Sequence, residues 1–402
     1  MNDMRKLLVL ISVLVSLSAS AADKDTSSVV HRIGIDVRPG GLTQHHAFFR
    51  GENALGKPLK ADASFHLKYS FCFPSSTLLG RIYPTAYQGV GLAAYTFGNP
   101  DEVGNPVALY VFQGARIADL GHDVSLDYEW NFGLSMGWRP YDPPSKNGAN
   151  TFNSVVGTKV NAYMNAGLFL SWHPSETWTV SAGLDMTHFS NGDTTFPNTG
   201  VNSIGARFGV TRFFAGRPFV SGNSHYGRRR PAIWFVDRLT LDIIPYGAWN
   251  EEFVSYEDKE YHVDGKFAVA GLHVNPLCSV AFPWLSVGPS LDIQYNEGMN
   301  IQNHIAGVNH ATDEIRFYRP SFLEQFAVGL SVRAELQMPV FALNFGVGHN
   351  VIYKGEELGG IYSVLTLKTF VSKKCFLNVG LKMSSRECSN NLMLGLGWRI
   401  GN

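Results

Sequence analysis

The chain has 402 residues, and its 33 Lys and Arg against 33 Asp and Glu give a formal charge of zero. This balance argues against a nucleic-acid-binding protein, which needs a basic surface to neutralise phosphates. Charged residues make up 16% of the chain and hydrophobic residues 45%, whereas soluble globular proteins carry about 25% charged residues. Beyond the first two dozen residues, no apolar run reaches the roughly 18 residues that a membrane helix needs. The composition therefore excludes both a helical membrane protein and a disordered chain.

Residues 1–21 have the parts of a secretory signal peptide in the usual order. Arg5 and Lys6 supply the positive charge, an apolar segment rich in leucine and valine follows, and residues 19–21 form a small-residue cleavage site. We therefore predict that the chain is exported and that the mature protein begins near Ala22.

The segment from Val124 to Trp138 shows the clearest periodicity in the mature chain. Every second residue in it is apolar, and the residues between are polar or glycine, which is typical of a strand with one apolar face. It is longer than the ~5–6 residues usual in soluble sheets, and it suffices for a tilted membrane crossing of ~9–11 residues. The alternation recurs at residues 341–348, 377–384 and 392–400. Because the polar positions hold Gly, Ser and Asn rather than Lys, Glu and Thr, we favour an outer-membrane β-barrel over a soluble β-sandwich.

Sixteen segments qualify as strands, and strands in hydrocarbon must close on themselves because their backbone groups find no water there. They lie near residues 28–38, 62–73, 82–97, 106–117, 123–138, 158–172, 177–190, 201–214, 233–248, 262–275, 282–296, 322–336, 339–352, 359–371, 375–385 and 391–401. An even number returns both termini to the periplasm. We expect an all-β, transmembrane antiparallel barrel of about 14–16 strands over residues 22–402, and we prefer one barrel.

The alternative of two tandem eight-stranded barrels stays open because of one unusual connection. Strand parity puts the long connections 39–61, 139–157 and 297–321 outside the cell. Residues 215–232, which include three consecutive arginines at 228–230, form a long connection on the periplasmic side and separate two sets of eight strands. A single barrel of sixteen strands could enclose a water-filled lumen.

Polar side chains stand out on one hairpin. Residues 180–186 place apolar side chains at every second position, and His188 and Ser190 continue this apolar file. On the return strand Asn202 continues the apolar file of residues 204–210. The three polar residues are therefore expected on the lipid-facing side, at the exterior end of the hairpin.

These residue types suit nucleophilic catalysis. A serine hydroxyl needs a base to take its proton, histidine titrates in the useful range, and a third group must orient the imidazole. If His188 stands opposite Asn202, their Cβ atoms are about 5 Å apart, and Ser190 is a neighbour on the same face. A Ser/His pair directed into lipid indicates a lipid substrate. The alternative is that His188 and Ser190 are ordinary interfacial residues at a strand end.

The same residues carry a resemblance to a known family. The segments 188–191 (His-Phe-Ser-Asn) and 197–200 (Pro-Asn-Thr-Gly) resemble the signature of the PagL-type lipid A 3-O-deacylases, whose Bacteroidetes homologues are often called acyloxyacyl hydrolases. Residues 128–133 and 138–142 resemble the longer homologues of that group. The smaller family members would match residues of about 60–215 only.

The resemblance implies a hydrolase of the bacterial outer membrane that removes an ester-linked acyl chain from lipid A or lipopolysaccharide, without metal or cofactor. By motif, Ser190 would be the nucleophile and His188 the general base. Asn191 would be a candidate oxyanion-hole donor. The acidic residue that orients the histidine in the family aligns with Asn202, which is an amide here.

This departure leaves three possibilities open. Asn202 suffices, or another acid serves, or the enzyme is weak or inactive. Among the acids, Asp193 in the loop is the nearest substitute, and Asp185 is less favoured because alternation puts it on the opposite face. An amide oxygen can accept the imidazole N–H, but it cannot stabilise imidazolium with a full charge.

The alternative function is that of a non-catalytic barrel, which would act as a pore, a structural protein or a binding protein. Lumen-facing Asp127, Glu129 and Asn131 would suit a pore. The His45-His46 pair and the four scattered cysteines show no metal-site spacing, and we expect no metal there.

Overall fold

The computed structural model describes residues 29–143, 148–214, 239–257, 259–280, 282, 284–309, 314–384 and 391–401. The predicted signal peptide, the arginines at 228–230 and Cys388 lie outside the described residues. Within these ranges no helix has the length and apolar character of a membrane span.

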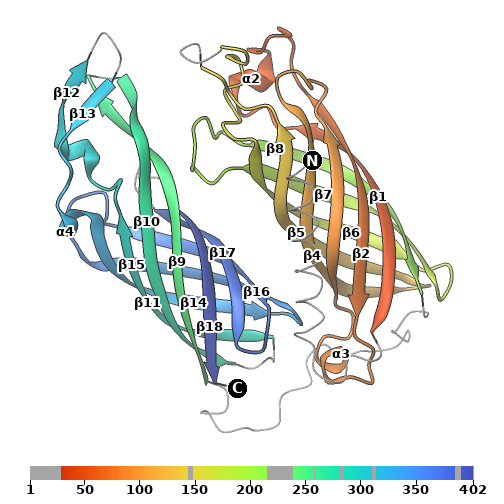
Figure 1. Cartoon of the computed structure of the whole chain (residues 1–402). Coiled ribbons are helices and arrows are strands. Elements are labelled where there is room, and N and C mark those ends of the chain that lie inside the picture. Colours follow the sequence, from red (N-terminus) through yellow and green to blue (C-terminus); the bar gives the residue numbers. More distant parts are fainter. Residues whose placement is uncertain are drawn as a thin grey trace. The chain divides into compact units, whose positions relative to one another are not determined.

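The strands form two separate closed antiparallel barrels of eight strands each (Figure 1). The first barrel closes between its first and last strands, where Val37 pairs with Phe208. Its strands are β1 (Val30–Leu42), β2 (Ala61–Cys72), β3 (Tyr87–Thr96), β4 (Gly104–Gly121), β5 (Val124–Trp138), β6 (Val160–Trp172), β7 (Trp178–Ser190) and β8 (Val201–Phe213).

The second barrel closes in the same way, where Trp398 pairs with Ile243. Its strands are β9 (Leu239–Tyr256), β10 (Lys259–Ser279), β11 (Leu285–Asn296), β14 (Phe326–Gln337), β15 (Phe341–Tyr353), β16 (Ile361–Phe370), β17 (Cys375–Ser384) and β18 (Asn391–Gly401). The strands β12 (Ile305–Asn309) and β13 (Glu314–Phe317) form a small sheet of their own.

The prediction of an all-β antiparallel fold with sixteen barrel strands is confirmed, but the preference for one barrel is wrong. Strand number and side-chain alternation are the same for one barrel of sixteen strands and for two of eight. Closure is decided by which edge strands pair, and here β1 pairs with β8 and β9 with β18. The long connection after residue 214 was the sequence signal for this division.

Two expected strands begin later than predicted because short helices occupy their first residues. The helix α3 (Leu78–Ile82) is capped by Thr77, whose hydroxyl accepts from Gly80 N at 3.0 Å, and β3 begins only after it. The helix α4 (Phe322–Gln325) has a capping box between Ser321 and Glu324 and precedes β14. A further short helix, α2 (Ala47–Arg50), lies in the β1–β2 connection, and η3 (Ile301–His304) precedes β12.

Ion pairs fill the middle of the first barrel. Three buried cations, Arg38, Lys68 and Arg207, contact the buried carboxylates of Asp36, Glu129 and Asp185. The Nη1 of Arg38 lies 2.8 Å from Asp185 Oδ2, and the Nζ of Lys68 lies 2.8 Å from Asp36 Oδ2. Equal numbers of opposite charges in direct contact make burial tolerable, because a lone buried charge would be very costly.

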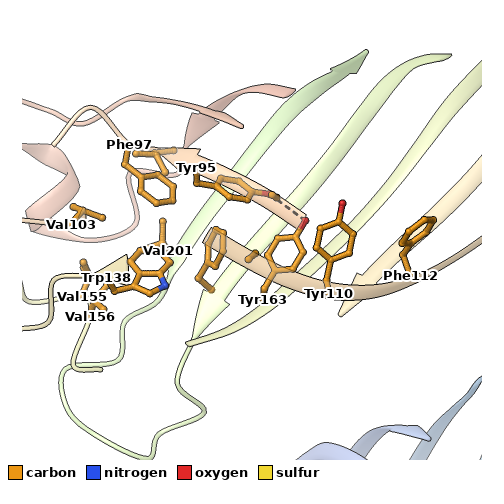
Figure 2. Close-up of a cluster of buried hydrophobic side chains, with 14 of the residues drawn as sticks. Tyr95, Phe97, Val103, Tyr110, Phe112, Trp138, Val155, Val156, Tyr163 and Val201 are labelled. Atoms are coloured by element: carbon orange, nitrogen blue, oxygen red, sulfur yellow. Dashed lines mark hydrogen bonds between the residues drawn. The ribbon is translucent and has the colours of Figure 1, made fainter. Parts of the chain in front are cut away.

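Aromatic side chains form a buried cluster inside the same barrel (Figure 2). The rings of Phe97 and Trp138 stack at a centroid distance of 5.4 Å, and the hydroxyl of Tyr95 donates to that of Tyr163 at 3.2 Å. These side chains are almost fully buried. Among the polar residues expected to line a pore, Asn131 instead donates to Tyr163 Oη at 3.3 Å.

The second barrel has its own buried charges. Lys368 Nζ contacts Asp242 at 2.6 Å and also contacts Glu335, and Arg399 Nη2 bonds to both carboxylates. An eight-stranded barrel is just wide enough for side chains to fill its interior. The expectation of a wide aqueous lumen, which depended on a sixteen-stranded barrel, is therefore not met in either barrel.

Candidate active site

The register of β7 and β8 brings the predicted histidine and asparagine together. His188 and Asn202 are direct cross-strand partners, and His188 Nδ1 lies 2.6 Å from Asn202 Oδ1. Because an amide oxygen only accepts, this bond requires the proton on Nδ1. The Nε2 atom is then left unprotonated, which is the form that a general base needs.

Alternation along β7 puts His188 and Ser190 on the outer face of the barrel. The preceding members of this file, Leu184 and Met186, are 66% and 62% exposed, while His188 and Ser190 are partly exposed. Among the described residues, no hydrogen bond joins Ser190 to His188. Catalytic hydrogen bonds are often long in the absence of substrate, so this geometry is compatible with a nucleophile and base that meet only when substrate is bound.

Phe189, between the two polar residues, points the opposite way, into the barrel. It is 2% exposed, and its ring lies 5.0 Å from the rings of Tyr95 and Trp138. Because neighbouring side chains on a strand point to opposite faces, anchoring Phe189 in the aromatic cluster holds His188 and Ser190 outward. Sequence reasoning did not single out this residue, although its place between the two polar residues was visible.

Close backbone packing supports the histidine from the other side of the hairpin. Gly200 has a φ of +76°, and a Cβ there would lie 2.9 Å from the carbonyl oxygen of Phe189 and 3.1 Å from His188 Cε1. A side chain at position 200 would displace the imidazole. The backbone of Asn202 is fixed as well, since its carbonyl oxygen accepts from Thr43 N at 2.9 Å.

The predicted oxyanion donor is engaged in the loop that follows β7. Asn191 Nδ2 donates to the carbonyl oxygen of Thr195 at 2.5 Å, and its backbone N–H donates to Asn198 Oδ1 at 2.8 Å. Asn191 is 8% exposed. In this structure Asn191 therefore organises the loop that follows β7.

The other residues considered in the sequence, Asp185 and the His45-His46 pair, make contacts that keep them out of this site. Asp185 is buried inside the barrel against Arg38, so it is on the wrong face to orient His188. His45 Nδ1 is 2.8 Å from Thr43 Oγ1, and the His46 ring accepts from Phe48 N at the start of α2. Within the described ranges, no three His, Cys, Asp or Glu side chains converge in a way that could hold a metal ion.

Each barrel matches a known protein-family model. Residues 85–211, which include His188 and Asn202, match the family model described as lipid A 3-O-deacylase (PagL). Residues 240–402 match the model described as acyloxyacyl hydrolase, C-terminal domain. The closed barrels and these matches define an outer-membrane β-barrel protein of bacteria. The chain belongs to the PagL-type lipid A deacylase family, whose members are ester hydrolases, and the resemblance drawn from the sequence is thereby confirmed.

Comparison with solved structures finds other barrels at low identity. Neisserial surface protein A is 9% identical with a TM-score of 0.31, and covers 46% of this chain and 99% of its own. The N-terminal β-barrel domain of Pseudomonas aeruginosa OprF is 12% identical with a TM-score of 0.26, and covers 46% and 97%. The siderophore receptor PirA from Acinetobacter baumannii is 8% identical with a TM-score of 0.24, and covers 93% and 70%. No curated protein matches the chain by sequence.

Proposed function

We propose that this protein is an esterase that removes an ester-linked acyl chain from lipid A, using Ser190 and His188 on the outer wall of its first barrel. The observation that carries the proposal is the 2.6 Å contact between His188 Nδ1 and Asn202 Oδ1, beside Ser190 on the same outward face. A site on this face is open to the acyl chains of the surrounding leaflet, whereas a site in the filled lumen is not.

The proposed reaction has two steps. Ser190 Oγ attacks the ester carbonyl carbon while His188 Nε2 takes the hydroxyl proton, and the sugar alcohol leaves with that proton as the acyl-enzyme forms. Water then attacks the acyl-enzyme with His188 again as the base, which releases the fatty acid and restores Ser190. During each attack the carbonyl oxygen becomes negative, and Asn191 is the proposed donor that stabilises it.

Asn202 is the residue on which the rate depends. Its amide oxygen can hold the imidazole in the required tautomer, but it supplies no negative charge to the imidazolium that forms during the reaction. A second candidate function follows from this substitution, namely a barrel that binds lipid A with little or no turnover. A pore is not favoured, because side chains fill both barrels.

The proposal is tested by mass spectrometry of lipid A from cells that express the wild-type chain or the Ser190→Ala variant. We expect lipid A that lacks one acyl chain with the wild type and intact lipid A with the variant. The two chains should be present in the outer membrane in equal amounts. Identical, unmodified lipid A from both strains under several growth conditions would contradict the esterase, and retained lipid A binding would then support the second candidate.

A further inference from the structure

The outer wall of the second barrel carries two polar side chains at mid-strand positions where its other strands are apolar. On the described strands β11 and β14–β18, the outward positions more than one residue from a strand end are apolar or glycine, apart from His349 and Ser363. On β9 and β10 the outward polar side chains lie toward the hairpin that joins these two strands, as Glu251, His262, Asp264 and Lys266 do. His349 is exposed and Ser363 is partly exposed. Neither residue belongs to the site on the first barrel.

The two side chains are neighbours on adjacent strands. His349 pairs with Ile361 and Val347 pairs with Ser363, so His349 and Ser363 are diagonal partners on one face, with Cβ atoms roughly 7–8 Å apart. Among the described residues, no hydrogen bond joins either side chain to another group. The donors of both side chains are thus available to one bound atom between them.

The backbone is irregular beside this pair. The pairing of β14 with β15 shifts register between Val328 and Gly329, which leaves Val351 as an extra residue two positions after His349. Bulges of this kind redirect side chains and are frequent next to functional sites. Val351 and Ile352 are 55% and 61% exposed, so the bulge presents apolar side chains at the surface two and three residues after His349.

The pair lies at the depth of lipid acyl chains. His349 precedes the exterior end of its strand, Tyr353, by four residues, which is about 13 Å along the strand and about 10 Å of depth at a tilt near 40°. The apolar band of such barrels is about 25 Å tall, so this depth falls in the outer leaflet. Polar groups placed in hydrocarbon are costly and usually functional.

We propose that His349 and Ser363 form a second lipid-binding site, which donates hydrogen bonds to the ester carbonyl of a lipid A acyl chain. Imidazole N–H and serine hydroxyl groups are donors, and an ester carbonyl is the acceptor that a lipid offers below its headgroup. The flanking wall of Leu330, Val347 and Leu365 suits the acyl chain itself. The site binds lipid and does not cleave it, so it does not depend on hydrolysis at Ser190.

Native mass spectrometry of the full chain titrated with lipid A tests this proposal. A Ser190→Ala background prevents turnover, and the variant carries His349→Leu with Ser363→Ala. We expect one lipid A binding event to weaken at least about fivefold, which matches a hydrogen bond of roughly 1 kcal/mol in a membrane. Leu394→Ala, on the outward face of β18 and two strands away from Ser363, removes apolar surface outside the proposed site. It is the matched control and should change affinity less than twofold.

Three outcomes would overturn the proposal. They are unchanged lipid A binding in the double variant, equal loss in the Leu394→Ala control, and equally strong competition by a diacyl phospholipid. Heat-modifiable migration on gels checks folding, and leucine in place of an outward histidine should leave the barrel folded. Because the readout is binding at the second barrel, its failure is distinct from failure of the esterase, which only Ser190-dependent deacylation measures.

Discussion

At the scale of single residues, the proposed site has an amide, Asn202, where the resemblance to the family implies a carboxylate. Asn202 Oδ1 contacts His188 Nδ1 at 2.6 Å, so the amide can orient the imidazole as a carboxylate would. It cannot stabilise the imidazolium with a full negative charge, because an amide is neutral. In a serine protease, replacing the corresponding carboxylate by an amide costs about 10⁴ in turnover, partly through a wrong tautomer. A rate well below that of an enzyme with the full triad is therefore expected.

We expect Asn202→Glu to keep or raise the deacylation rate, because a carboxylate both orients His188 and stabilises the imidazolium. The gain is bounded by about 10⁴. A time course of lipid A mass with purified protein in micelles measures it, and Asn202→Glu combined with Ser190→Ala is the inactive control. A complete loss of activity in a correctly folded Asn202→Glu variant would show that the amide has a role of its own.

At the scale of the element, β7 connects the interior packing to the outer wall. The Phe189 ring is held among Tyr95, Trp138 and Tyr163, and the strand's alternation transmits that constraint to His188 and Ser190. The faces of these residues could be predicted from the sequence, because alternation is local. The anchoring of Phe189 could not, because its partners come from β3, β5 and β6.

We expect Phe189→Ala to lower kcat more than it changes KM, since the variant frees the end of β7 without altering the lipid-facing wall. Its free energy of unfolding should fall by about 3–5 kcal/mol, measured by denaturant unfolding in vesicles. Phe189→Leu should recover part of the loss in kcat and part of the loss in the free energy of unfolding. Leu184→Ala, on the outward file of the same strand, is the control, and an equal fall in kcat there would contradict a positioning role for Phe189.

At the scale of the whole molecule, each barrel is a filled cylinder. Each barrel holds ion pairs among its own buried charges, such as Arg207 with Glu129 at 3.0 Å and Lys368 with Asp242 at 2.6 Å. The residues that suggested a pore in the sequence, such as Glu129, are members of these networks. The aromatic cluster occupies further space inside the first barrel.

We expect no channel steps when the purified protein is added to planar bilayers, because the interior of each barrel is occupied by packed and ion-paired side chains. A general porin added to the same membrane serves as the positive control. Steady single-channel steps from the folded protein would contradict this prediction and would favour the pore among the functions considered.

The strands, their faces and the outward position of His188, Ser190 and Asn202 could be predicted from the amino-acid sequence. They follow from period-two alternation, which each segment carries locally. The closure of eight strands before the next eight begin became visible only in the three-dimensional structure, as did the pairing of Arg38 with Asp185 across 147 residues. Both depend on pairing between segments far apart in the chain, and such pairing leaves no local periodic pattern in the sequence.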